Sequence, residues 1–428
     1  MTDIVIVARL GVDGESRVER LVCHPRLPLV AGLDAERPAV HIWDCSAGRL
    51  DLLATIGAQL DPYGDVGSWD RATPSVAWHP AEPALAVAHD GRVLHWRQPP
   101  ADGAPRAYGG EEDLAMVHVP VADYQHVAFS PDGNALWAWP AHDDSGMWDR
   151  SDTIDLLSGE VTSGRGWDTG IVEHPAGGLV TTYNSDQGAT LMLFARTDDT
   201  SGPLRFLRRA LIIDVDGYEA PVFSSDGRHF AIRGNAYAET LAVYAFPSLR
   251  LTLFTTLDAE DKSESGPPAT AGQSVDEPDW SRHNIAFDAR PGVLWIGGPD
   301  GTLFELDLDD DRVTPHHQLA GSPVTAVSTL ATGQLVAATG AGEVLLLSVS
   351  AVPRPGDLET MAGAVCTFVD STSEVSDDST DLESQLSLTD GERSWEQEDL
   401  DTVTEASGAD PTWLQIQAAM NKVRAQNG

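Results

Sequence analysis

A short unit recurs seven times along the chain, and this repetition constrains the fold more than any other feature of the sequence. Each copy contains an apolar strand, a turn rich in Pro, Gly, Asp or Ser, and a second apolar strand. The turns of successive copies are centred on Pro25, Pro80, Pro131, Pro175, Ser225, Ala289 and Ala331. They lie roughly 42 to 64 residues apart, which suits a four-stranded antiparallel unit with its connections.

The copies can cover their apolar faces only by stacking on one another. A third apolar strand follows in most of them, as in segments 39–44, 92–97, 240–246 and 302–308. A single meander of this kind leaves its faces and edges open to water, whereas copies arranged around an axis cover one another and keep only short edges. The sequence therefore predicts an all-β fold, a β-propeller of about seven blades, over residues 1–352.

The two ends of the repeat region indicate how the ring closes. The last copy has no clear fourth strand after Ser350, and the apolar segment 3–10 has no partner before it. Since unpaired strand edges are avoided in stable sheets, we expect these two to pair and close a seven-bladed propeller with an N-terminal strand.

Several short motifs carry a family resemblance. They are Trp43-Asp44 ending a third strand, Ser130-Pro131-Asp132-Gly133 after a first strand, Asp90-Gly91 before Trp96, and Asp300-Gly301 before Leu306. In these motifs, over about residues 1–352, the chain resembles the WD-repeat propellers, although most copies lack the terminal Trp-Asp pair. The resemblance implies that the loops entering the blades meet on one face around a central channel.

Two segments do not follow the repeat. Residues 258–279 consist of Pro, Gly, Ser and acidic residues, and we interpret them as a mobile insertion between the fifth and sixth blades. Residues 353–409 are strongly acidic, with Arg354 and Arg393 as the only basic residues. Because such a composition buries too little apolar area to offset the entropy of ordering, we expect a disordered acidic linker there.

The chain ends in a predicted amphipathic helix over residues 410–426. Asp410 is a favourable N-cap residue and Pro411 suits the first helical position. The apolar residues Trp413, Ile416, Met420 and Val423 follow at helical spacing and form one stripe. Tethered by the acidic linker, this helix would suit a groove on a partner protein. The alternative is that the helix packs back on the propeller.

The charge of the chain limits its partners. The formal net charge is −39, so we expect no binding to nucleic acid or to an anionic membrane. No apolar stretch is long enough to span a bilayer, and the N-terminus lacks the basic start and cleavage site of a secretory signal, which predicts a cytoplasmic protein. The only lysines are Lys262 and Lys422, a bias that suggests a bacterial genome rich in G and C.

An aromatic residue lies beside an acidic residue just before the first strand of five copies. The pairs are Trp69-Asp70, Asp123-Tyr124, Trp167-Asp168, Tyr218-Glu219 and Asp279-Trp280. On the loop face of a propeller, these pairs would form an aromatic and acidic ring that suits a basic or amphipathic peptide. The alternative is that the aromatic side chains wedge between blades as structural plugs.

Signatures of catalysis are weak. The sequence contains no phosphate-binding loop and no GxSxG nucleophile motif, and its three cysteines are too far apart for a zinc site. His24, His79 and His174 occupy equivalent positions in three copies, where capping of a turn is a sufficient role.

We therefore expect a non-catalytic scaffold for protein–protein interactions that binds no cofactor or metal and is monomeric by itself. One alternative is a propeller hydrolase, with a metal held by the acidic ring or by Asp143-Asp144. Another is a sensor that binds a small ligand in the channel.

Overall fold

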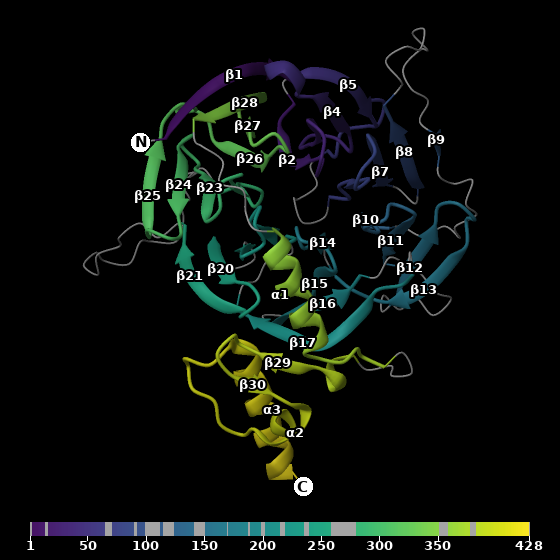
Figure 1. The fold of residues 1–428 in the computed structure, drawn as a ribbon, viewed down its shortest axis with the longest axis vertical. Helices are drawn as coiled ribbons and strands as arrows, with labels where there is room; N and C mark the ends of the chain where they lie inside the picture. The colour runs from purple at the N-terminus through teal and green to yellow at the C-terminus, as the bar shows by residue number, and fades with distance from the viewer. Residues whose placement is uncertain are drawn as a thin grey trace.

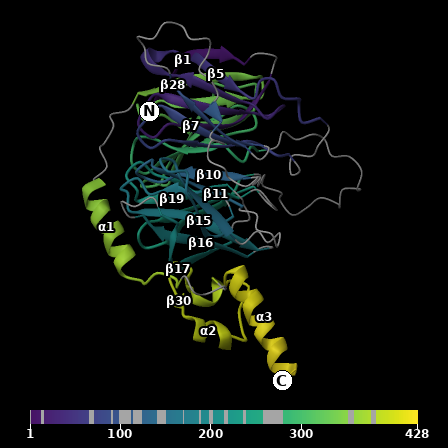
Figure 2. The same cartoon turned by 90° about the vertical axis from the view of Figure 1, so that its right-hand side faces the viewer.

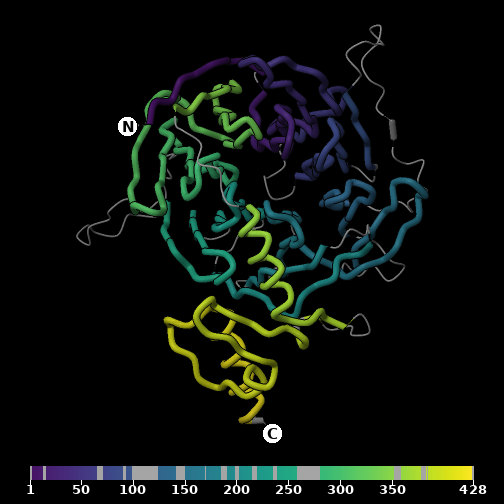
Figure 3. The backbone as a smooth tube through the Cα atoms, in the orientation of Figure 1, coloured from purple at the N-terminus to yellow at the C-terminus, as the bar shows by residue number. Residues whose placement is uncertain are grey.

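The computed structural model shows seven β-sheets arranged as blades around a common axis (Figure 1). The structure describes residues 2–12, 16–64, 71–89, 92–98, 112–113, 124–140, 150–168, 170–186, 189–197, 202–214, 219–234, 239–257, 280–350, 358–376 and 382–427. The expected insertion at 258–279 lies outside these ranges. The tube in Figure 3 follows the chain once around the ring, from the first blade to the seventh.

Each blade is an antiparallel meander, as the repeat predicts. The first is β2 (Val18–Cys23), β3 (Leu29–Asp34), β4 (Val40–Asp44) and β5 (Asp51–Ile56). The second is β6 (Ser75–Trp78), β7 (Ala84–His89), β8 (Arg92–Arg97) and β9 (Glu112–Asp113). The third is β10 (His126–Phe129), β11 (Ala135–Trp139), β12 (Arg150–Asp155) and β13 (Val161–Arg165). The fourth is β14 (Val172–Glu173), β15 (Leu179–Asp186), β16 (Ala189–Arg196) and β17 (Arg205–Ile213).

The remaining blades complete the circle. The fifth is β18 (Val222–Phe223), β19 (His229–Gly234), β20 (Thr240–Ala245) and β21 (Arg250–Thr256). The sixth is β22 (Ile285–Phe287), β23 (Val293–Gly297), β24 (Leu303–Asp307) and β25 (Arg312–His316). The seventh is β26 (Val324–Thr329), β27 (Leu335–Thr339), β28 (Glu343–Ser350) and, from the N-terminus, β1 (Asp3–Gly11). The prediction of a seven-bladed propeller is confirmed.

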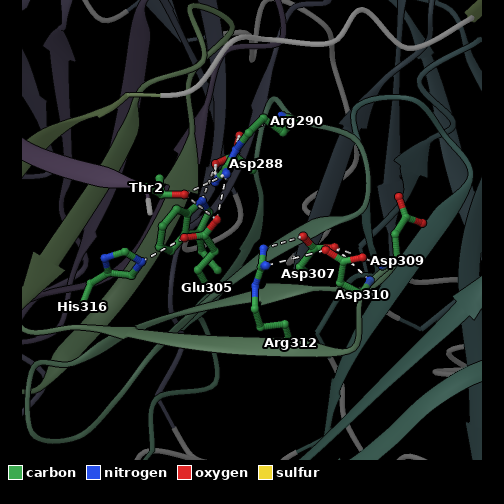
Figure 4. Close-up of polar contacts among 10 residues, drawn as sticks. Thr2, Asp288, Arg290, Glu305, Asp307, Asp309, Asp310, Arg312 and His316 are labelled. Carbon is green, nitrogen blue, oxygen red and sulfur yellow. Dashed lines mark hydrogen bonds and ion pairs between the residues drawn. The ribbon is translucent and has the colours of Figure 1, made fainter.

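Strand β1 closes the ring by pairing antiparallel with β28, with Ile4 opposite Val349. A buried polar network ties the same strand to the sixth blade (Figure 4). Its centre is the Glu305 carboxylate, which accepts hydrogen bonds from Arg290 Nη1 at 2.7 Å and from Thr2 Oγ1 at 2.9 Å. The imidazole of His316 lies 2.9 Å from the same carboxylate. Closure therefore depends on side chains from distant parts of the chain as well as on strand pairing.

Three histidines fasten the turn between the first and second strands of their blades. They are His24, His79 and His174. His24 Nδ1 accepts a hydrogen bond from the backbone N–H of Leu27 at 3.1 Å, and Nε2 lies 2.9 Å from the Glu82 carbonyl oxygen in the next blade. His174 reaches the carbonyl oxygen of Gly227 in the same way. Any Cβ at Gly227 would lie 2.4 Å from that imidazole, which explains the glycine. The expected capping role is confirmed, and each ring also links two blades.

The expectation of a disordered linker over 353–409 is corrected for residues 358–376 and 382–409, whereas 353–357 and 377–381 lie outside the described ranges. Helix α1 (Leu358–Asp370) lies along one flat face of the ring in Figure 2, and a short 3-10 turn (Glu383–Gln385) follows later in the chain. Strands β29 (Ser387–Thr389) and β30 (Ser394–Trp395) then extend the fourth blade, because β29 pairs parallel with β17. Helices α2 (Gln397–Thr402) and α3 (Thr412–Asn427) follow.

Local apolar spacing explains why this acidic segment folds. In α1 the buried residues Met361, Val365, Phe368 and Val369 recur at helical spacing and pack against the fourth and fifth blades. Cys366 lies on the exposed side of the same helix, whereas Cys45 is buried. No helix in the described ranges has the length and apolar character needed to cross a membrane.

Candidate functional site

A cavity of about 1240 Å³ is lined by residues from six of the seven blades. Its walls come mainly from the first strands of the first four blades and from residues that flank the first strands of the fifth and sixth blades. Because strands from different blades converge there, side chains far apart in the sequence face one common space. A cavity lined by several blades in this way is a candidate site for ligand binding.

Glu219, Arg282 and His283 form a compact cluster in the cavity wall. A carboxylate oxygen of Glu219 lies 3.2 Å from His283 Nδ1 and the other lies 3.6 Å from Arg282 Nε. Burial lowers the pKa of His283 to about 3, so this imidazole is neutral at pH 7. Burial opposes ionisation of Glu219 too, but the surrounding nitrogen-bearing side chains prevail and lower its pKa. The Glu219 carboxylate is therefore ionised, and both of its oxygens already have a neighbouring side chain.

Glu19, Arg20 and His126 line the same cavity from the first and third blades. Burial raises the pKa of Glu19 above its ordinary value, and the nearby guanidinium groups offset this only in part. Burial lowers the pKa of His126 to about 4, and the ring stacks on Trp139 with centroids 5.8 Å apart. Within the described ranges, Arg20 makes no hydrogen bond and no ion pair, although its charge helps to lower the pKa of Glu219. The hydrogen-bond donors of its guanidinium group are available for a ligand.

The structure places the aromatic and the acidic members of the expected ring in different surroundings. Tyr124 is 4% exposed and its hydroxyl donates to Asp152 at 2.6 Å, while Trp167 is 2% exposed in the core between the third and fourth blades. Trp280 packs at the core between the fifth and sixth blades. These aromatics match the structural plugs considered as the alternative, and the surface role expected for Tyr124 and Trp167 is corrected.

Only the acidic partners of the ring reach the channel within the described residues. Asp168 and Glu219 line the cavity. The remaining members lie outside the described ranges, namely Trp69, Asp70, Asp123, Tyr218 and Asp279. The pair Asp143-Asp144, considered for a metal, also lies outside them. In the described part of the chain, no three His, Cys, Asp or Glu side chains converge as a metal site would require.

Sequence reasoning identified Asp168 and Glu219 but missed other polar residues that line the channel. Arg20, His126 and His283 lie a few positions further along each repeat, at or near the start of the first strand. A signal was present in the sequence, because polar residues recur at this offset inside otherwise apolar strands. The aromatic residues are more conspicuous in the sequence, but large apolar side chains next to a strand are more often buried in the core.

Helix α3 presents a second candidate surface. Ile416, Met420 and Val423 are 41%, 44% and 56% exposed, whereas Trp413 is partly buried. The opposite side of the helix is fixed, since Asn421 Nδ2 donates to the backbone carbonyl oxygen of Leu400 at 2.6 Å. Three of the four predicted stripe residues therefore face outward from a docked helix rather than from a helix on a free tether.

A polar triad in the first blade has the order found in nucleophilic sites. His41 Nε2 lies 3.2 Å from Asp34 and Nδ1 lies 3.2 Å from the hydroxyl of Thr55. The same triad borders a second cavity of about 370 Å³. However, Asp34 also accepts hydrogen bonds from the backbone N–H groups of Glu36 and Arg37 in the turn after β3. These contacts identify the triad as a clamp that holds the turn.

Comparison with known proteins adds no family to this description. No family model matches the chain, and no curated protein matches it in sequence. The propeller is therefore established by its strand arrangement, and the resemblance to WD-repeat proteins stays with the short motifs that suggested it.

Proposed function

We propose that this protein is a non-catalytic interaction scaffold whose propeller carries a docking helix for a partner protein. The supporting observation is the outward-facing stripe of Ile416, Met420 and Val423 on α3. Single exposed apolar residues are common, but three aligned at helical spacing form a continuous strip of the kind that binds in an apolar groove.

The docked position of α3 favours binding by this helix. Its opposite face buries Leu414 and Ala418, and the helix packs against α2 and against β16 of the fourth blade. The C-terminal unit of β29, β30 and α2 is in turn joined to the fourth blade through β17 and β29. A helix held in this way loses little further entropy when a partner covers the stripe, so more of the contact energy remains for affinity.

Charge indicates the chemistry of the partner. The chain has a net charge of −39, and Glu398, Asp401 and Glu405 are exposed near α3 in sequence. A matching surface would be an apolar groove rimmed by lysine and arginine side chains. Such a rim would steer association and would make the affinity fall as salt is added.

The test replaces two stripe residues together, Ile416→Ser and Met420→Ser, and uses Ala419→Ser on the same helix as the matched control. Since all three positions are exposed, we expect each protein to keep its stability within about 0.5 kcal/mol. Loss of two apolar anchors should weaken binding by about 2 kcal/mol or more, a factor of roughly 30.

Binding is measured with a protein captured by the full-length chain from its native cells and then purified. The proposal requires the double variant to lose affinity, the Ala419→Ser protein to keep it, and affinity to fall with salt. Equal affinity of all three proteins would refute the role of the stripe. Salt-independent binding would refute the basic groove.

A further inference from the structure

We propose that the central channel binds a small anion, through a carboxylate or phosphate group held between Arg20 and His126. This site is separate from the docking helix α3 and goes beyond the scaffold role proposed above. The two side chains come from the first and third blades and line one cavity of about 1240 Å³. That volume is ample for a small anion with its bridging waters.

The first argument is that both groups have unused hydrogen-bonding capacity. In the part of the chain that the structure describes, neither the Arg20 guanidinium nor the His126 imidazole takes part in a hydrogen bond or an ion pair. Both side chains are half-buried. A guanidinium removed from bulk water without a partner is costly, and a ligand with two oxygens matches its planar fork of donors.

The second argument is that no nearby carboxylate contacts Arg20 directly within the described residues. Arg20 is close enough to lower the pKa of Glu219, but the close contacts of that carboxylate are with His283 at 3.2 Å and Arg282 at 3.6 Å. Glu19 is adjacent in the sequence, but burial disfavours its charged form. The ring of His126 is also fixed in place by stacking on Trp139, so its free nitrogen has a defined direction. The Arg20 guanidinium and the oriented His126 nitrogen are therefore the groups that would hold an anionic ligand.

The experiment is isothermal titration of the full-length protein with inorganic phosphate and, separately, with succinate, at constant ionic strength. The two titrations distinguish a phosphate ligand from a carboxylate ligand. We expect at least one of them to bind with a stoichiometry of one. The Arg20→Gln variant should bind it at least about ten-fold more weakly, because a charge-assisted hydrogen bond is lost.

Two further variants guard the interpretation. His126→Phe keeps an aromatic ring against Trp139 but removes the nitrogen, so it should also weaken binding even if Arg20→Gln disturbs the fold. Arg49→Gln removes an exposed arginine of the first blade that does not line the cavity, and it should leave binding unchanged. No heat with either anion at millimolar concentration, or equal affinity of the wild-type protein and the correctly folded Arg20→Gln and His126→Phe proteins, would overturn the proposal. Either result leaves the role of α3 untouched.

Discussion

Phe368→Ala should lower the free energy of unfolding by about 3–5 kcal/mol, as expected for deletion of a fully packed aromatic side chain. Phe368 is 3% exposed and lies where α1 meets the fourth and fifth blades. Its ring centroid is 5.1 Å from those of Phe194 and Phe246, and the guanidinium of Arg209 lies over the ring at 5.1 Å. No other α1 residue joins as many aromatic neighbours among the described contacts.

The measurement combines denaturant unfolding with limited proteolysis of α1. Thr367→Ala is the matched control, since Thr367 is exposed on the same helix and its hydroxyl donates only within the helix, to the Gly363 carbonyl oxygen. We expect that control to change stability by no more than about 0.5 kcal/mol. If Phe368→Ala leaves both stability and protease protection unchanged, α1 is not docked, and the segment is the free linker that its composition suggests.

Glu305→Ala should destabilise the ring closure by about 3–5 kcal/mol, because it leaves buried polar partners without their acceptor. The carboxylate of Glu305 is the common partner of Arg290, His316 and Thr2 (Figure 4). Loss of the Thr2 contact also weakens the attachment of β1 to the sixth blade. Thermal and denaturant unfolding would measure the effect.

The matched control for this network is Glu343→Gln. Glu343 pairs with Arg9 of β1 at 3.2 Å, but the two side chains are 32% and 52% exposed. Exposed pairs of this kind contribute about 0–1 kcal/mol, so the control should change stability little. Similar losses from both variants would show that buried and exposed contacts of β1 matter equally, contrary to our expectation.

The stabilisation that Glu305 contributes should be lost at low pH. Burial tends to raise the pKa of Glu305, but hydrogen bonds from Arg290, His316 and Thr2 outweigh it and hold the pKa below the ordinary 4.5. The stabilisation is therefore present above pH 4.5 and is lost as the pH falls through the lowered pKa. The stability difference between wild-type protein and Glu305→Ala should shrink over that acidic range and stay constant above it.

The predicted ring of binding residues shows why the place of a residue in the repeat is easier to infer than the direction of its side chain. Sequence reasoning placed Tyr124 and Trp167 correctly just before first strands, but both turn into the cores between blades. The direction depends on neighbours that arrive from other parts of the chain. Tyr124 is held by Asp152, 28 residues later, and no local pattern encodes that contact.

The prediction of disorder for the acidic segment was wrong for a different reason. Averaged over its length, the composition indicates disorder, yet Met361, Val365 and Phe368 occur at helical spacing inside it. Their burial needs the apolar surface of the fourth and fifth blades, which exists only once the propeller has formed. Likewise, β29 is three residues long and pairs only because the edge of β17 is available.

The sequence by itself determined the propeller, its closure by the N-terminal strand, and the histidine-capped turns. These features rest on alternation, turn chemistry and spacing, which are local and repeated. The tertiary structure alone decided that α1 docks on the ring, that α3 exposes Ile416, Met420 and Val423, and that Arg20 and His126 share one channel. These outcomes depend on surfaces and cavities that several blades build together, so no single segment of the chain contains them.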